Sequence, residues 1–112
     1  MSAGKYNILI QQGSTFFKQI VLRGNDSVPV DLTGATIMSQ VRETYDSVTP
    51  LATMVTAIPT PANGTFTLTI ADTVTAAMDF TTGVYDVEVH YADGSVDRVL
   101  EGKVVFSKEV TR

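Results

Sequence analysis

The chain has 112 residues, of which 44% are hydrophobic and 18% are charged, with a formal net charge of −4 and no cysteine. This length corresponds to a single domain over residues 1–112 with one continuous core, and the hydrophobic content argues against disorder. The acidic balance disfavours nucleic acid as a partner, the lack of cysteine excludes disulfides and Cys-ligated metals, and no segment predicts a signal peptide or membrane span.

Alternation of apolar and polar residues predicts several short strands in the first half of the chain. These strands are expected at residues 6–10, 15–23 and 35–43. The second contains mostly β-branched and aromatic residues, which favour a strand. Its alternation slips between Phe17 and Ile20, and a β-bulge near Lys18 would explain the slip.

Two polar segments separate these strands from their neighbours. In Asp31-Leu32-Thr33-Gly34, the Asp31 carboxylate can accept hydrogen bonds from the amides that follow, Gly34 completes the turn, and Leu32 is expected to enter the core. Residues 44–50 form a polar loop with Tyr45 near its middle. An exposed loop tyrosine is a candidate contact residue, although such a side chain more often lies across its own strand.

The second half of the chain begins with a weaker strand at residues 51–58. A clear strand follows at 65–70, with three apolar residues directed inward and three threonines outward. Asp72 is a candidate N-cap for one short helix near 72–79.

The strongest pattern is a hairpin between residues 84 and 105. Its first strand places two sets of side chains on opposite faces: Tyr85, Val87, Val89 and Tyr91 against Val84, Asp86, Glu88 and His90. Asp93-Gly94 predicts a tight turn with positive φ at both residues, and the return strand begins at Val96. The whole chain is therefore expected to form an all-β, antiparallel immunoglobulin-like β-sandwich of about seven or eight strands with one short helix.

The residues that usually carry catalysis or bind metals are sparse. His90 is the only histidine and shares an outward face with Asp86 and Glu88. An acid on the return strand, Asp97 or Glu101, could complete a weak calcium site, but we expect a solvated acidic face. We therefore expect no enzyme activity, no catalytic residue, no cofactor and no metal.

Arg98 and Glu101 on the return strand are candidate interaction residues. The Arg98 guanidinium can stack on a neighbouring tyrosine or pair with Asp86 or Glu88 across the hairpin. The ion pair, contributing less than ~1 kcal/mol, is the preferred interpretation.

Several motifs together resemble a recurrent domain of tailed-phage virion proteins, similar to the N-terminal domain of phage baseplate upper proteins and to small tail or head proteins with the same sandwich. The matching segments are Asp31-Leu32-Thr33-Gly34, the Thr-rich strand 65–70 before a short helix, Tyr85-Asp86-Val87-Glu88, Asp93-Gly94, Arg98-Val99-Leu100-Glu101-Gly102 and Val110-Thr111-Arg112. The resemblance covers nearly the whole chain, and its motifs are structural rather than catalytic.

The resemblance implies a non-enzymatic structural component of a tailed-bacteriophage virion, in the tail or baseplate, assembled in the host cytoplasm. Its expected partners are other virion proteins and copies of itself in a symmetric assembly. The contacts would be made by the termini, including Arg112, by the loop at 44–50 with Tyr45, and by an outer sheet face. The alternatives are a head decoration or auxiliary capsid protein and a host-surface carbohydrate-binding module.

Overall fold

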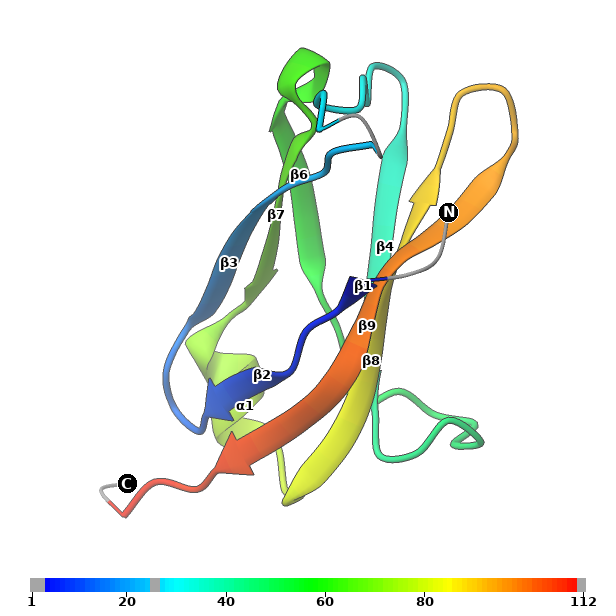
Figure 1. The fold of residues 1–112 in the computed structure, drawn as a ribbon. Helices are drawn as coiled ribbons and strands as arrows, with labels where there is room; N and C mark the ends of the chain where they lie inside the picture. Colours follow the sequence, from blue (N-terminus) through cyan, green and yellow to red (C-terminus); the bar gives the residue numbers. More distant parts are fainter. Residues whose placement is uncertain (1–3, 25–26, 111–112) are drawn as a thin grey trace.

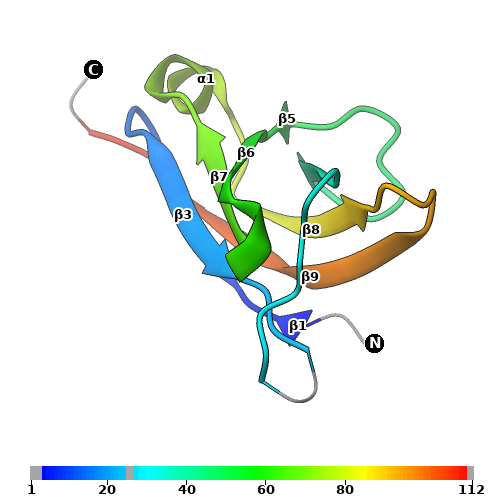
Figure 2. The same cartoon turned by 90° about the horizontal axis from the view of Figure 1, so that it is seen from above.

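The computed structural model describes residues 4–24 and 27–110, which form two β-sheets facing each other in a sandwich-like arrangement (Figures 1 and 2). The large sheet contains β1 (Gly4–Lys5), β2 (Ile8–Gln11), β4 (Thr36–Arg42), β5 (Ala52–Thr53), β8 (Thr82–His90) and β9 (Val96–Ser107). The small sheet contains β3 (Phe16–Val21), β6 (Val55–Thr60) and β7 (Thr65–Ile70), and the helical segments are η1 (Pro61–Asn63) and α1 (Asp72–Ala77). The all-β, sandwich-like prediction is confirmed at this level.

Strand pairing is mostly antiparallel, with one exception at the N-terminal edge. The large sheet has the order β1-β9-β8-β4-β5, and β2 also pairs with β9. Both β1 and β2 run parallel to β9, so the predicted antiparallel arrangement holds for the other strand pairs but not at this edge. The described residues form nine strands rather than seven or eight, because the short β1 and β5 add to the longer strands.

The predicted strand at residues 51–58 is divided between the two sheets. Its first part is β5, which pairs with β4, and its second part is β6, which pairs with β7. Buried Met54 lies at the crossing, and its amide donates to the Ser39 carbonyl at 2.9 Å. The Thr56 hydroxyl then donates to the Ile37 carbonyl at 2.8 Å, so this crossing closes one side of the sandwich.

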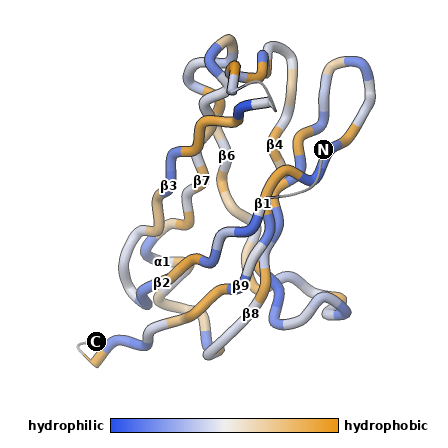
Figure 3. The backbone as a smooth tube through the Cα atoms, viewed as in Figure 1, coloured by the Kyte–Doolittle hydropathy of each residue, from blue (hydrophilic) through white to orange (hydrophobic). Residues whose placement is uncertain are grey.

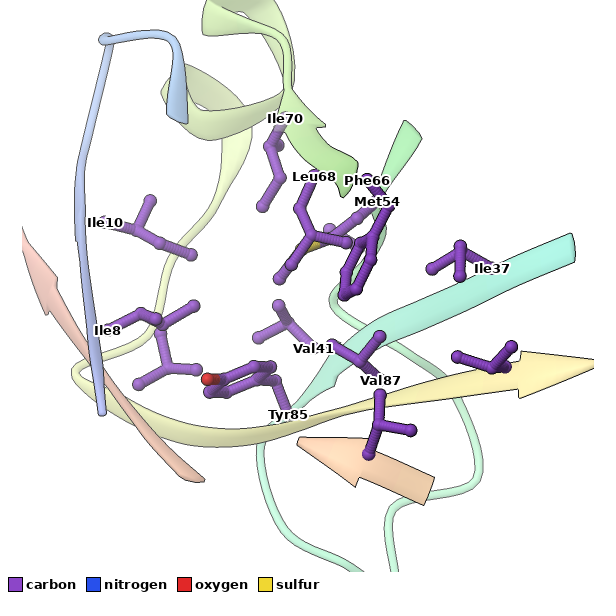
Figure 4. Packing of buried hydrophobic residues seen from close by; sticks show 14 of the residues in the cluster. Ile8, Ile10, Ile37, Val41, Met54, Phe66, Leu68, Ile70, Tyr85 and Val87 are labelled. Atoms are coloured by element: carbon purple, nitrogen blue, oxygen red, sulfur yellow. The ribbon is translucent and has the colours of Figure 1, made fainter. Parts of the chain in front are cut away.

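The core lies between the sheets, where inward side chains of both sheets meet (Figure 4). Phe66 and Leu68 of β7 are fully buried against residues such as Val41 and Val87 of the large sheet. Burial of a side chain of this size contributes about 2 kcal/mol relative to exposure. The predicted alternation of β4 and β8 is confirmed, because their inward sets are the buried ones. In β7 the apolar set is buried as predicted, but Thr65, which was predicted to point outward, is buried as well.

Strand β3 lacks the predicted bulge. Its register with β7 is continuous from Phe16 to Val21, and alternation places Lys18 on the inner, half-buried face with Phe16 and Ile20. The Lys18 ammonium lies 4.8 Å from the centroid of the Tyr6 ring. A cation–π contact thus accommodates the charge that the apolar pattern did not anticipate.

The turn between β8 and β9 is longer than the predicted two-residue turn. Tyr91 donates to the Ser95 carbonyl at 2.8 Å, so the loop has three residues, and only Gly94 has positive φ, at 93°. The Asp93 carboxylate instead accepts from the Ser95 amide and hydroxyl at 2.9 and 2.7 Å. Figure 3 shows this loop as a hydrophilic stretch.

The predicted Asp31 turn is confirmed. The Asp31 carboxylate accepts from the Thr33 amide at 3.0 Å, Gly34 has a φ of 77°, and Leu32 is buried in the core. The N-cap prediction was wrong, because α1 is preceded by Ala71 in extended conformation and Asp72 is the first helical residue.

Candidate functional site

The outward side chains of β4, β8 and β9 form a polar surface, here named the β4–β8–β9 face. Strand register arranges them in three rows: Met38–Glu88–Arg98, Gln40–Asp86–Glu101 and Arg42–Val84–Lys103. The face therefore combines methionine, arginine and carboxylate side chains on one nearly continuous sheet surface.

A β-bulge in β9 brings two of the predicted interaction residues together. Strict alternation would place residues 98 and 101 on opposite faces of the sheet. Val87 faces Leu100 while Glu88 faces Arg98, so buried Val99 is the additional residue of β9. The bulge leaves Arg98 and Glu101 both directed outward.

Ion pairs connect these residues across three strands. The Arg98 Nε atom lies 3.3 Å from Asp86 Oδ2, and Arg98 Nη1 lies 3.9 Å from Glu101 Oε2. Lys5 of β1 donates to Glu101 Oε1 at 2.8 Å. The predicted cross-strand pair between Arg98 and Asp86 is thus confirmed, and its partly exposed members make it a weak contribution to stability.

The carboxylates of this network have pKa values that shift in opposite directions. Partial burial raises the pKa of Asp86, and the attraction of nearby Arg98 only partly offsets this effect. The hydrogen bond from Lys5 holds the pKa of Glu101 below its ordinary value. His90 Nε2 lies 3.2 Å from Glu88 Oε1 at the end of the same face.

A surface hollow of about 640 Å³ lies on this face beside the loop that follows β4. Its lining residues come from β4, β5, β8, β9 and that loop: Ile37, Met38, Ser39, Gln40, Arg42, Tyr45, Thr53, Met54, Val84, Tyr85, Asp86, Glu88 and Arg98. Apolar and charged groups therefore share one concave surface, which suits an amphipathic contact segment of a partner.

Arg42 fastens the loop that carries Tyr45. Its Nη1 atom donates to the carbonyls of Ser47 and Val48 at 2.6 and 2.9 Å, and its Nη2 atom donates to Gln40 Oε1 at 2.8 Å. The loop is consequently tied to the sheet while the Tyr45 side chain remains 69% exposed.

The sequence-predicted interaction residues thus fall into one region, with one exception. Tyr45 and Arg98 line the same hollow, and Glu101 joins them through its ion pair with Arg98. Arg112 lies outside the described residues. Sequence reasoning missed Lys5, because only the parallel pairing of β1 with β9 places it opposite Glu101.

The described residues contain no group of three or more His, Cys, Asp or Glu side chains placed to hold a metal ion. Within residues 4–24 and 27–110, no helix has the length and apolar character needed to cross a membrane.

No protein-family model matches this chain, and no curated protein matches it with significance.

Proposed function

We propose that this chain is a non-enzymatic structural protein of a tailed-bacteriophage virion, located in the tail or baseplate, where it packs against other virion proteins and copies of itself. The motif resemblance supports the virion context. The observation that carries a packing role is the hollow on the β4–β8–β9 face, lined by exposed Tyr45 and by Arg98.

The composition of this face supports protein recognition rather than turnover of a substrate. Tyrosine, methionine and arginine are enriched at protein interfaces, and Tyr45, Met38 and Arg98 supply all three around the hollow. Met38 is half exposed, so apolar area remains for a partner to cover. The ion pairs of Arg98 hold its guanidinium in place for such a contact.

The proposal includes an immunoglobulin-like class for the sandwich. Two facing sheets with mostly antiparallel strands, in a chain of about 100 residues, support this class. Parallel β2–β9 pairing at one edge is compatible with an otherwise antiparallel sandwich.

Cryo-electron microscopy of purified particles, with this chain located by fitting, tests the proposal. Ring-symmetric copies in the tail or baseplate would support it. Copies spread over the capsid lattice would overturn it in favour of head decoration. Absence from the particle would overturn the virion role, and a rise in melting temperature with host-surface glycans would then favour the carbohydrate-binding alternative.

Variants of the β4–β8–β9 face test whether the hollow is needed for incorporation of the chain into particles. Tyr45→Ala and Arg98→Glu are expected to lower incorporation into particles by about tenfold, because they remove interface side chains of the kind that dominate binding. Val74→Ala, at an exposed position on α1, is the matched control and should be incorporated normally. Equal incorporation of all three variants would contradict a contact role for the hollow.

A further inference from the structure

Strand β3 is an open edge of the small sheet. The sheet has the order β3-β7-β6, so within the described part of the chain β3 pairs only with β7 (Figures 1 and 2). Its pairing covers Phe16 to Val21 without a register shift. The result is a six-residue strand of continuous register that has one unpaired side among the described residues.

The other sheet edges carry features that discourage pairing with another chain. β6 contains Pro59, has a register shift between Ala57 and Thr60, and is tied to β4 through the Thr56 hydroxyl. β5 has two residues, and β1 and β2 are short and separated. Proteins use such prolines, irregularities and short strands to block edge-to-edge association. β3 has no proline and no bulge.

The alternation of hydrogen-bonding direction along β3 identifies the main-chain atoms that point to its open edge. The Leu22 amide, one residue beyond β3, donates to the Gly64 carbonyl at 2.8 Å in continuation of the β3–β7 register, so Leu22 directs its amide to the side of β7. Hydrogen-bonded and non-hydrogen-bonded pairs alternate, so the even-numbered residues of β3 bond to β7. The amides and carbonyls of Phe17, Gln19 and Val21 therefore point toward the open side.

The charge distribution allows two copies to meet at this edge despite a net charge of −4. All 12 Asp and Glu residues of the chain lie outside β3, β6 and β7. Lys18 is the single charged residue in the three strands, and it faces the interior with its ammonium over Tyr6. The outward residues of β3 are Phe17, Gln19 and Val21, of which Phe17 is 60% exposed.

We propose that β3 is a self-association edge, at which two copies of this chain pair antiparallel about a two-fold axis through Gln19. In this register Phe17 faces Val21 of the second copy, and Gln19 faces its own equivalent. The residues whose amides point outward then bond to one another, which completes the ladder across both small sheets. The interface is isologous, as a two-fold axis requires.

Two alternative registers are less favourable. A shift by one residue would place Phe17 opposite Ile20 of the second copy. Amides that point to the open edge would then face residues whose amides point to β7, and the ladder could not form. An axis through Lys18 would match the outward amides again but place two ammonium groups opposite each other. The axis through Gln19 instead places Lys18 opposite Ile20 of the second copy. This inference rests on the proposed assembly role for its biological meaning.

Sedimentation velocity of the full chain, from about 10 μM to about 1 mM, measures the association. A six-residue edge is smaller than a standard interface, so a weak and concentration-dependent dimer is expected. Hydrogen exchange measured across the same range should show rising protection of the Phe17, Gln19 and Val21 amides. A monomer at every concentration, or a dimer that leaves these amides unprotected, would overturn the proposal.

Two pairs of charge variants test the register. Gln19→Lys places two ammonium groups at the axis and should weaken the dimer by about tenfold, whereas Ala57→Lys, in the same row of the sheet but on β6, should not. The double variant F17E/V21E opposes carboxylates and should be monomeric, whereas F17E/V21K forms Glu–Lys pairs across the interface and should dimerise. Identical association of the members of either pair would overturn the proposed axis.

Failure of this inference is distinguishable from failure of the proposed function. A chain located in the tail that does not self-associate through β3 would overturn only the edge proposal. A chain that dimerises through β3 but is absent from particles would overturn the virion role and leave the edge proposal standing.

Discussion

The hydroxyl of Tyr85 donates a hydrogen bond of 2.5 Å to the main-chain carbonyl of Tyr6. Tyr85 is a buried residue of β8, and Tyr6 lies between β1 and β2 at the edge of the large sheet. Burial raises the pKa of the Tyr85 phenol, so it remains a neutral donor. The bond ties the N-terminal segment to the interior of the sheet, across a sequence separation of 79 residues.

Tyr85→Phe is expected to lower the free energy of unfolding by about 1–2 kcal/mol, because it leaves the Tyr6 carbonyl without this donor while the ring still fills its place. Urea unfolding followed by fluorescence or circular dichroism measures the change. Tyr45→Phe removes the same hydroxyl from an exposed residue and should leave stability unchanged. Equal stability of Tyr85→Phe and the parent chain would show that the hydrogen bond contributes nothing.

Gly102 is required where the N-terminal segment runs beside β9. A Cβ atom at this position would overlap the main-chain oxygen and carbon of Tyr6, which are held by the bond from the Tyr6 amide to the Glu101 carbonyl at 2.9 Å. Gly102→Ala is therefore expected to cost about 2–3 kcal/mol of stability. In Gly4→Ala the new Cβ would lie 3.5 Å from the nearest side-chain atom, an ordinary contact, so this control should cost little. Comparable stabilities for the two variants would contradict the steric argument.

Local patterns predicted the parts of the fold that depend on neighbouring residues. The alternation of β8 and the Asp31 turn depend on residues within a few positions of each other, and both were predicted correctly. The parallel pairing of β2 with β9 joins the two ends of the chain, for which periodicity carries no signal. The sheet change at Met54 was missed for the same reason, because an apolar strand looks alike in either sheet.

In the candidate site, too, local patterns identified single residues but not their arrangement in space. Tyr45 was recognised as a loop tyrosine, and Arg98 and Glu101 as charges on the return strand. The proximity of Arg98 and Glu101 depends on the bulge at Val99. Because of this additional residue, each later residue of β9 lies on the sheet face opposite to the one that strict alternation from Arg98 predicts. Strict alternation would have separated Arg98 from Glu101, so only the structure explains why both lie on one face.

Thr75 joins α1 to the turn between β2 and β3. Its buried hydroxyl accepts from the Gly13 amide at 3.1 Å and donates to the Ser14 carbonyl at 2.8 Å. Thr75→Val preserves the shape but removes both bonds, and is expected to lower the free energy of unfolding by about 1–3 kcal/mol. Thr75→Ser keeps the hydroxyl and should lose less, which thermal or urea unfolding can resolve. A larger loss in Thr75→Ser than in Thr75→Val would show that the methyl group matters more than the hydrogen bonds.

Asp86 is expected to oppose folding when it is ionised. Because burial raises its pKa in the folded chain, the folded state gains stability relative to the unfolded state as the pH falls through that raised pKa. Asp86→Asn removes this effect. At pH 7 the variant should be as stable as the parent or more stable, because Arg98 still has Glu101 as an ion-pair partner when the charge of Asp86 is removed. Urea unfolding at pH 7 measures the difference. A lower free energy of unfolding for Asp86→Asn than for the parent chain would show that the ion pair between Asp86 and Arg98 outweighs the cost of burying the carboxylate.

The ion pair between Lys5 and Glu101 makes stability depend on pH in the opposite direction at acidic pH. The hydrogen bond lowers the pKa of Glu101 from its ordinary value of 4.5 and raises that of Lys5 from 10.5. The stability that Glu101 contributes is therefore present above pH 4.5 and lost as the pH falls through its lowered pKa, and the Lys5 contribution is lost as the pH rises through its raised pKa. The difference in unfolding free energy between the parent chain and Lys5→Gln should thus be largest between these limits and shrink on both sides. Lys103→Gln, which removes the same charge from β9, controls for net charge. A difference that does not change between pH 2 and pH 7 would show that Lys5 does not act through the Glu101 carboxylate.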